Sequence, residues 1–266
     1  GEISRDSASS YVYCLHEANV VVDFESRKQL IVDQLDDMAV HEKAEVVASP
    51  DLLDEVTSLV EWPVALLGNF DPEFLKLPEE ALISAMQSHQ CYFHLVDKDN
   101  RLLPKFITIA NIASSNPQTV IAGNERVISP RLSDAAFFIN QDKKTSLDNR
   151  LAHLKTVLFQ SKLGSYHDKA ERVARLAGYI ADKIGADATV ASRAGLLCKA
   201  DLASDMVGEF PELQGIMGGY YARHDGEDSS VSDAISEHYR PVVSGGDLPD
   251  TPAGQCVAIA DKIDTL

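Results

Sequence analysis

The sequence is poor in cysteine, in tryptophan and in basic residues, and it has no long apolar run. Its 266 residues include four cysteines and one tryptophan. The cysteines, at positions 14, 91, 198 and 256, form no Cys-x-x-Cys pair, so reduced, buried thiols are expected rather than a zinc site or a disulfide framework. No segment approaches the roughly 18 apolar residues of a membrane span and no signal-peptide pattern is found, which favours a cytoplasmic protein.

Lysine and arginine number 24 against 41 acidic residues, a net charge of −17. An acidic surface repels a phosphate backbone, which argues against nucleic acid as a partner over most of the chain. The imbalance is uneven, because residues 200–250 hold eleven acids against two bases, whereas residues 98–131 hold five bases against two acids. Contact with RNA is therefore expected within residues 98–131, with Lys143 and Lys144 following shortly after in the sequence. The alternative is a solvated surface of mixed charge.

Sequence motifs of common active sites are also absent. There is no phosphate-binding loop, no nucleophile elbow and no dinucleotide fingerprint. The sequence therefore assigns no catalytic residue. What is present is an apolar content of 45%, enough for one large core or two moderate ones, and we expect two domains.

Periodicity predicts an α+β module in the first half of the chain. Residues 1–45 are expected to form a mostly helical lead-in that is broken near residues 20–23, followed by helices over 51–60 and 77–87. Two β-rich runs, 91–97 and 102–110, flank a four-residue turn and predict a hairpin. The run 118–128 predicts another strand, interrupted by a turn at Gly123 and Asn124.

The second half is predicted to be all-helical, which gives three segments: 1–45, 46–145 and 146–266. Ser146 is expected to cap a helix that runs to Gly164, and the next helix to end at Gly185. Asp187, one of Ser229 and Ser230, and Thr251 are further predicted caps. Because Gly1 stands in place of a methionine and the last helix has no stop signal, we expect an internal piece of a longer chain.

The stretch 194–222 carries the densest packing signal. Its first half places Leu197, Cys198, Leu202 and Met206 on one helical stripe that ends at Gly208, and its second half predicts a helix that starts at Pro211. The segment KADLASDMVGEFPELQGIMGGYYA, residues 199–222, resembles the signature of the beta subunit of bacterial glycyl-tRNA synthetase. Residues 52–78, 89–93, 123–138 and 260–266 are similar to the same family, in the same order.

This resemblance implies a part in attaching glycine to its tRNA. In that family the beta subunit recognises the tRNA and docks the alpha subunit, which carries the ATP and magnesium chemistry, in an assembly expected to hold two copies of each. No cofactor or metal is expected in this chain. Lys105, Arg126 and Arg131 are the predicted tRNA contacts, with Glu125 and Asp134 as further charged groups on a loop and helix start; a structural ion-pair network would explain the same charges.

The helical half resembles the HD superfamily, metal-dependent phosphohydrolases that hold their ions with His and Asp. Lys169 falls at the position of the first ligand, Cys198 and Lys199 at the His-Asp pair, and Asp261 near the last Asp, so only one ligand is retained. A lysine puts a fixed positive charge where the ion should lie, and we expect a degenerate domain.

Three other groups could bear on metal binding. Two of them, His224–Asp225 and His167–Asp168, are His-Asp dipeptides that lie outside the core helix. The third is Asp201 with Asp205, which could face the same way on a single helix and serve a cation; a solvated acidic face is the alternative for these two aspartates. Two other functions stay open: an active phosphohydrolase that depends on Asp261, and an interaction scaffold without RNA contact.

Overall fold

A computed structural model describes residues 10–266, apart from the side chain of His89. The chain divides into two compact units, residues 1–135 and 136–266. The boundary lies within helix α5 (Pro117–Asp142). In the described part of the chain, no helix combines the length and apolar character that crossing a bilayer requires.

The first unit is built on a four-stranded antiparallel sheet in the order β1-β3-β4-β2. Its strands are β1 (Glu45–Val47), β2 (Val64–Asn69), β3 (Phe93–Val96) and β4 (Leu102–Ala110). The predicted hairpin is confirmed by β3 and β4, in which Phe93 lies opposite Ile107. In its turn, Asn100 has a φ of 58° and the Asp97 carboxylate accepts hydrogen bonds from the backbone of Asp99 and Arg101. An asparagine tolerates this left-handed conformation, which fixes the turn.

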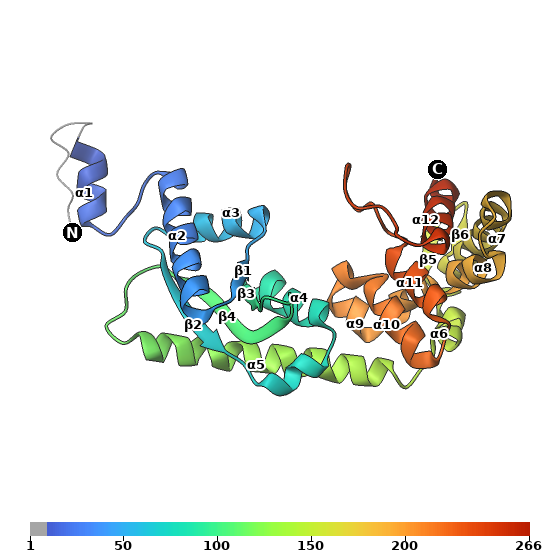
Figure 1. Cartoon of the computed structure of the whole chain (residues 1–266), viewed down its shortest axis with the longest axis horizontal. Helices are drawn as coiled ribbons and strands as arrows, with labels where there is room; N and C mark the ends of the chain where they lie inside the picture. Colours follow the sequence, from blue (N-terminus) through green and yellow to red (C-terminus); the bar gives the residue numbers. More distant parts are fainter. Residues whose placement is uncertain (1–9) are drawn as a thin grey trace. The chain divides into compact units, whose positions relative to one another are not determined.

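One face of the sheet is covered by α2 (Phe24–Glu42) and α3 (Pro50–Leu59), as Figure 1 shows. Ile31 and Leu35 of α2 pack with Leu53 of α3 and with Phe93 and Ile107 of the sheet. The helical character predicted for residues 10–45 and 51–60 is confirmed, and residues 1–9 of the predicted lead-in lie outside the described residues. Helix α1 (Tyr11–Glu17) contacts the rest of this unit through His16, whose ring centroid lies 5.0 Å from that of Trp62.

The predicted strand over 118–128 is wrong, because these residues open the 26-residue helix α5. Helical spacing is present in Ile128, Leu132, Ala135 and Ile139, all fully buried, and it overrides the β-branched run that suggested a strand. Gly123 makes no turn, and a Cβ built there would meet open space. Glu125, Arg126, Arg131 and Asp134 therefore lie on one long helix and not on a loop and helix start.

Two strands, an α-helix and a 3-10 helix complete the first unit together with α5. β1 and β2 were not predicted, whereas α4 (Glu79–Gln90) matches the expected helix near 77–87, and the 3-10 helix η2 (Pro72–Lys76) precedes it. Helix α5 lies across the sheet from α2: the Glu125 carboxylate accepts from the backbone N–H of Asn69 at 2.8 Å, and Tyr92 donates to Asn124 at 2.7 Å. The family-like residues Asn124 and Glu125 thus join α5 to the sheet.

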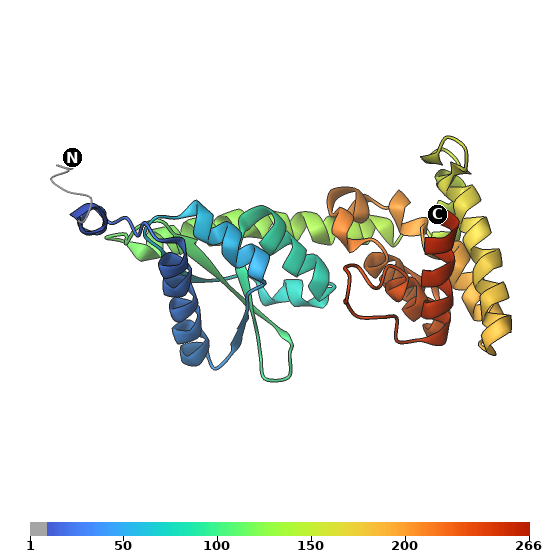
Figure 2. The same cartoon turned by 90° about the horizontal axis from the view of Figure 1, so that it is seen from above.

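The second unit is helical, so the predicted α+β class with a helical second part is confirmed. Its elements are α6 (Leu147–Leu154), the small hairpin β5 (Leu158–Gln160) and β6 (Gly164–Ser165), α7 (Tyr166–Ile184), α8 (Ala188–Leu197), η3 (Ala200–Ala203), α9 (Asp205–Glu209), η4 (Pro211–Leu213), α10 (Ile216–Asp225), α11 (Ser229–Glu237) and α12 (Pro252–Thr265). Figure 2 shows α7 and α12 side by side.

Four of the predicted helix ends in this unit are confirmed. Ser146, Asp187 and Thr251 accept hydrogen bonds from the first turns of α6, α8 and α12, and Gly185 ends α7 at a φ of 75°. The cap of α11 is Asp228, not Ser229 or Ser230. Short polar side chains satisfy the free N–H groups at each of these helix starts.

Three predictions of continuous helix in this unit are wrong. The helix that starts at Leu147 ends at Leu154, and residues 158–165 form the β5–β6 hairpin instead. The expected helix through 197–208 is broken after Leu197 into η3 and α9, which continues past Gly208 to Glu209. Pro211 starts only the short η4, and the next α-helix begins at Ile216.

Candidate functional sites

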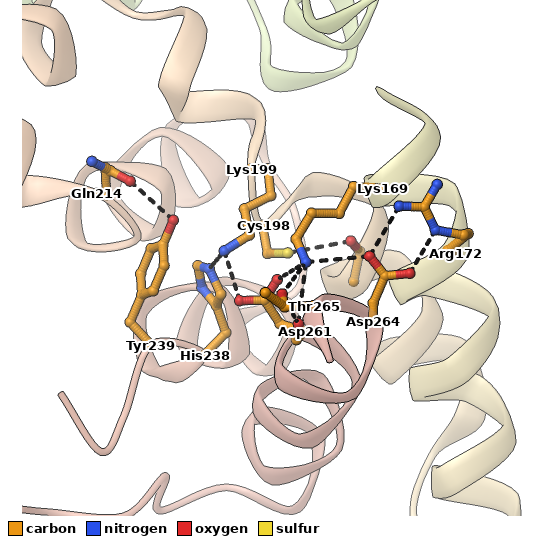
Figure 3. A network of polar contacts seen from close by, with 11 residues as sticks. Lys169, Arg172, Cys198, Lys199, Gln214, His238, Tyr239, Asp261, Asp264 and Thr265 are labelled. Carbon is orange, nitrogen blue, oxygen red and sulfur yellow. Dashed lines mark hydrogen bonds and ion pairs between the residues drawn. The ribbon is translucent and has the colours of Figure 1, made fainter. Parts of the chain in front are cut away.

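Lys199, between α8 and η3, is 2% exposed and lies at the centre of a polar network shown in Figure 3. Its ammonium group donates to Asp261 Oδ2 at 2.8 Å and lies 3.8 Å from the centre of the Tyr239 ring. Burial alone would lower the pKa of Lys199, but acidic neighbours such as Asp261 raise it above its ordinary value. Lys199 is therefore a buried, permanent cation.

His238, at the end of α11, fixes the other side of Lys199. Its Nδ1 lies 2.6 Å from the carbonyl of Ile235, which can only accept, so Nδ1 carries the proton. Nε2 is then free to accept from the Lys199 ammonium group, 2.9 Å away. Burial, reinforced by the charge of Lys199, lowers the pKa of His238 to about 3. The imidazole is neutral and works as an acceptor for the lysine.

Lys169 of α7 is a second buried cation on the same carboxylate. Its ammonium group is 3.0 Å from Asp261 Oδ1, donates to the Thr265 hydroxyl at 2.8 Å and lies 4.6 Å from the centre of the Phe159 ring. Asp264 pairs with both Lys169 and Arg172. Burial would raise the pKa of Asp261, but the two ammonium groups, Lys199 first, hold it below its usual value.

The residues matched to the HD ligand positions therefore do come together, but they do not fit a metal ion. Among the described residues, the carboxylates that form salt bridges with Lys169, Arg172 and Lys199 are those of Asp261 and Asp264, and the histidine beside them is neutral. Cys198 is fully buried and burial raises the pKa of its thiol to about 12, so it offers no thiolate. A divalent ion would have to displace Lys169, Lys199 and Arg172 from the two carboxylates and Lys199 from His238, against the positive charges that these side chains hold in place.

Asp201 lies beside this network and holds the turn before α10. It is completely buried, its Oδ2 accepts from the backbone N–H of Gly215 at 2.6 Å and of Gly218 at 3.0 Å, and within residues 10–266 its Oδ1 has no hydrogen-bond partner. Burial raises its pKa to about 6 despite these two bonds. Asp205 begins a separate helix, so the idea that both carboxylates share one helical face is wrong.

The pair Gly218 and Gly219 permits a close approach of α10 to α11. A Cβ on Gly218 would lie 2.8 Å from Ile235 Cγ2, and one on Gly219 would lie 1.8 Å from Ser236 Oγ. Tyr221, two residues on, donates to Asp142 at 2.7 Å. The stretch 199–222 that carries the family resemblance is thus used for packing and for buried polar contacts.

The remaining His–Asp pairs have structural partners. The Asp225 carboxylate accepts from the backbone N–H of Leu147 at 2.7 Å. Asp168 forms a capping box with Ser165 at the start of α7. His167, Asp168 and Glu171 bring one potential ligand atom each within 4.8 Å of one another, but on an exposed surface where Asp168 is already used by the cap. Helix capping accounts for this carboxylate without an ion.

Arg172, His238 and Asp264 were missed by sequence reasoning. The Asp264 carboxylate follows Asp261 at a spacing of three residues on one helix, which places both side chains on the same side and could have indicated a pair. His238 gave no such signal, because it reaches Lys199 from a sequence distance of 39 residues.

The three predicted tRNA contacts do not share one surface. Lys105 on β4 forms an ion pair with Glu42 at the end of α2, on the face of the sheet opposite α5. Arg126 and Arg131 are exposed on α5 and, among residues 10–266, neither forms a salt bridge. Five helical residues separate their side chains by about 140° around the axis. Of the three predicted residues, the two arginines are therefore the ones that no carboxylate holds.

Comparison with known proteins identifies the chain. A model of the family described as "Glycyl-tRNA synthetase beta subunit" matches residues 1–266. Curated relatives named "Glycine--tRNA ligase beta subunit" are 52% identical in Pseudomonas syringae pv. syringae (strain B728a), over 265 residues, and 53% identical in Pseudomonas fluorescens (strain Pf0-1), over 260 residues. These alignments cover 100% and 98% of this chain but 39% and 38% of the relatives. The chain thus spans about two fifths of the length of those relatives and belongs to the glycyl-tRNA synthetase beta subunit family.

Proposed function

We propose that this chain is part of the beta subunit of a two-subunit glycine–tRNA ligase and helps to attach glycine to its tRNA. The observation that carries the proposal is the match of the family to all 266 residues, together with relatives at 52% identity that bear the ligase name. Binding of the tRNA and docking of the alpha subunit are the roles proposed for it, in an assembly of two alpha and two beta subunits.

ATP and magnesium belong, in this proposal, to the alpha subunit. The charges of the helical unit support this division, because lysine and arginine side chains already occupy the Asp261 and Asp264 carboxylates of its buried network. The same network disfavours an HD-type phosphohydrolase, because Asp261 is already neutralised by two ammonium groups.

Contact with tRNA is proposed for α5, through Arg126 and Arg131. Both are exposed and free of salt bridges within the described residues, whereas Lys105 is held by Glu42. Guanidinium groups bind phosphate oxygens with two hydrogen bonds, so an unpaired arginine on a rigid helix is well suited to an RNA backbone. The acidic stretch 200–250 is not expected to face the RNA.

The proposal is tested by measuring glycylation of tRNA with the full-length beta subunit that contains this chain, mixed with the alpha subunit of the same source. Activity in the mixture that greatly exceeds that of alpha alone is expected. The same two proteins, both folded and soluble, giving no glycylated tRNA would overturn it. An activity against nucleotides that is lost in Asp261→Asn would instead favour the phosphohydrolase.

A further inference from the structure

The loop between α11 and α12, together with the outer side of α12, forms an exposed apolar face in the second unit. Its five aliphatic side chains are Val242 (81% exposed), Val243 (67%), Leu248 (68%), Ile259 (46%) and Ile263 (53%). Figure 2 shows the loop as an open arc beside α12. We call these five residues the α12 apolar face. Leu248 and Ile259 line one cavity, and exposed apolar patches are characteristic of interaction surfaces.

Helix α12 carries apolar side chains at buried positions and also at exposed ones. Val257, Ala260 and Cys256 are fully buried against α7, α8 and α11. Ile259 and Ile263 are four residues apart and border the buried side, because at 100° per residue they lie about 60° and about 20° from Cys256 around the helix axis. The apolar side of α12 therefore extends beyond the helices that cover it, which indicates a further packing partner at its exposed edge.

The α12 apolar face is also hollow. A cavity of about 340 Å³ lies between the loop and α12, with Pro241, Leu248, Pro249 and Ile259 in its wall. The polar groups at this cavity are Arg240, Gln255 and Lys262. A mostly apolar hollow with a few polar groups at its edge is suited to holding apolar side chains that are flanked by a carboxylate.

The charge at this edge is unusual for its surroundings. The stretch 200–250 holds eleven acidic residues but only two basic ones, and one of those two, Arg240, lies at the cavity. The Lys262 ammonium group donates to the carbonyl of Arg240 at 3.0 Å, and the Arg240 guanidinium pairs with the exposed Asp250. Arg240 and Lys262 therefore both line the cavity, where they can attract a carboxylate, which for Arg240 would replace the exposed Asp250.

We infer that the α12 apolar face is the docking site of another segment of the beta subunit's own polypeptide, outside residues 1–266. That segment presents aliphatic side chains to the cavity and an Asp or Glu side chain to Arg240 and Lys262. Curated relatives are about two and a half times as long as this chain, since it covers 39% of them, so such polypeptide exists in the family. A tethered segment has a high effective concentration at the site, which favours it over a separate partner. The inference rests on the family assignment and not on the proposed function.

The test measures solvent access in the full-length beta subunit. Single variants Val243→Cys and Ile263→Cys are labelled with a thiol reagent and followed peptide by peptide by mass spectrometry, which separates them from the four native cysteines. Ile184→Cys is the matched control, because Ile184 is 58% exposed at the end of α7 and is not among the residues that line the cavity. We expect both test positions to react at least about tenfold more slowly than the control in the beta subunit alone.

Charge and partner choice are tested in the same assay. Lys262→Glu, added to Ile263→Cys, should restore at least about threefold faster labelling, because it repels the carboxylate of the docked segment. Equal rates at test and control positions would overturn the inference. So would protection that appears only after the alpha subunit is added, or protection that grows with protein concentration, since these outcomes assign the face to alpha or to a second copy.

Discussion

The Lys199 ammonium group lies 2.8 Å from Asp261 Oδ2 while Lys169 lies 3.0 Å from Oδ1, so a single carboxylate divides its two oxygens between two buried cations. Such an arrangement is sensitive to loss of Asp261, the anion that the two lysines share. Removing Asp261 leaves both lysines with less compensation, whereas removing one lysine leaves the carboxylate paired with the other.

Asp261→Asn is therefore expected to destabilise the helical unit more than Lys199→Met does. Breaking a buried pair costs about 3–5 kcal/mol of unfolding free energy, and Lys199→Met should fall at or below the lower end because Lys169 remains. Urea unfolding followed by circular dichroism measures both variants. Arg223→Ala is the control: its pair with Asp233 is about half exposed, and its loss should cost under about 1 kcal/mol. Equal costs for all three variants would contradict the network.

Acid should destabilise the fold through His238. Its pKa is about 3 in the folded chain against an ordinary 6.5, so as pH falls from 6.5 towards 3 the unfolded chain takes up a proton that the folded chain refuses. The contribution of the neutral imidazole to the free energy of unfolding is therefore fully present above pH 6.5 and is lost as the pH falls from 6.5 towards 3. His238→Gln, which retains an acceptor for Lys199, should flatten the loss in unfolding free energies measured by urea titration from pH 7 to pH 4. An unchanged slope in this variant would contradict the buried, neutral imidazole.

Asp201 should act in the opposite direction. Its pKa is about 6 in the folded chain against 3.8 for the ordinary carboxyl, so the folded chain takes up the proton first as pH falls through 6. Protonation of Asp201 thus contributes to the free energy of unfolding below pH 3.8, and this contribution is lost as the pH rises through 6. Asp201→Asn removes the contribution, and the decline in unfolding free energy between pH 6 and pH 4 should become steeper than in the unmodified chain. A shallower decline would contradict the raised pKa.

Two glycines in helices should respond to alanine with opposite signs. Gly218→Ala places a methyl group 2.8 Å from Ile235 Cγ2 and 3.0 Å from the buried Asp201 carboxylate, so we expect a loss of roughly 1–3 kcal/mol. Gly123→Ala meets open space on α5 and should stabilise by about 0.5–1 kcal/mol, since alanine loses less backbone entropy in a helix. Thermal unfolding of each variant checks the signs. A destabilising Gly123→Ala would argue against the long helix.

Reversal of charge on α5 tests the proposed binding of RNA. Arg126→Glu and Arg131→Glu, each in the full-length beta subunit with alpha, should weaken tRNA binding and reduce the slope of log affinity against log salt by roughly one for each phosphate that the variant no longer binds. Filter binding at several salt concentrations measures both. Lys105→Gln is the comparison, because Lys105 is paired with Glu42 and should leave affinity and slope unchanged. Unaltered binding in all three would favour a scaffold that does not touch RNA.

The structural features predicted best from the sequence are those that depend on residues close to one another in the chain. The β3–β4 hairpin and the caps at Ser146, Asp187 and Thr251 depend on residues within a few positions of one another, and they were recognised. Strands β1 and β2 were missed, because each pairs with a strand more than 35 residues away in sequence. Residues 118–128 were misread, because β-branched residues and Gly123 outweighed a helical spacing that becomes clear only after Ile128.

Prediction of the candidate site followed the same division. Lys169, Lys199 and Asp261 were placed together by a family resemblance and not by any spacing, since 30 and 62 residues separate them in sequence. His238 could not be found this way, because its role depends on a single carbonyl that orients its ring. Free and paired basic residues also look alike in sequence, and only the ion pair with Glu42 sets Lys105 apart from Arg126 and Arg131.

The two lysines at the core of the helical unit have a consequence for how this unit fares in a cell. A cation that is part of the polypeptide is supplied by the ribosome with every copy, at fixed stoichiometry, and neither a chelator nor a rival metal can remove it. Chelation by EDTA should leave this network intact, and its assembly should not vary with the nutritional supply of zinc, iron or manganese.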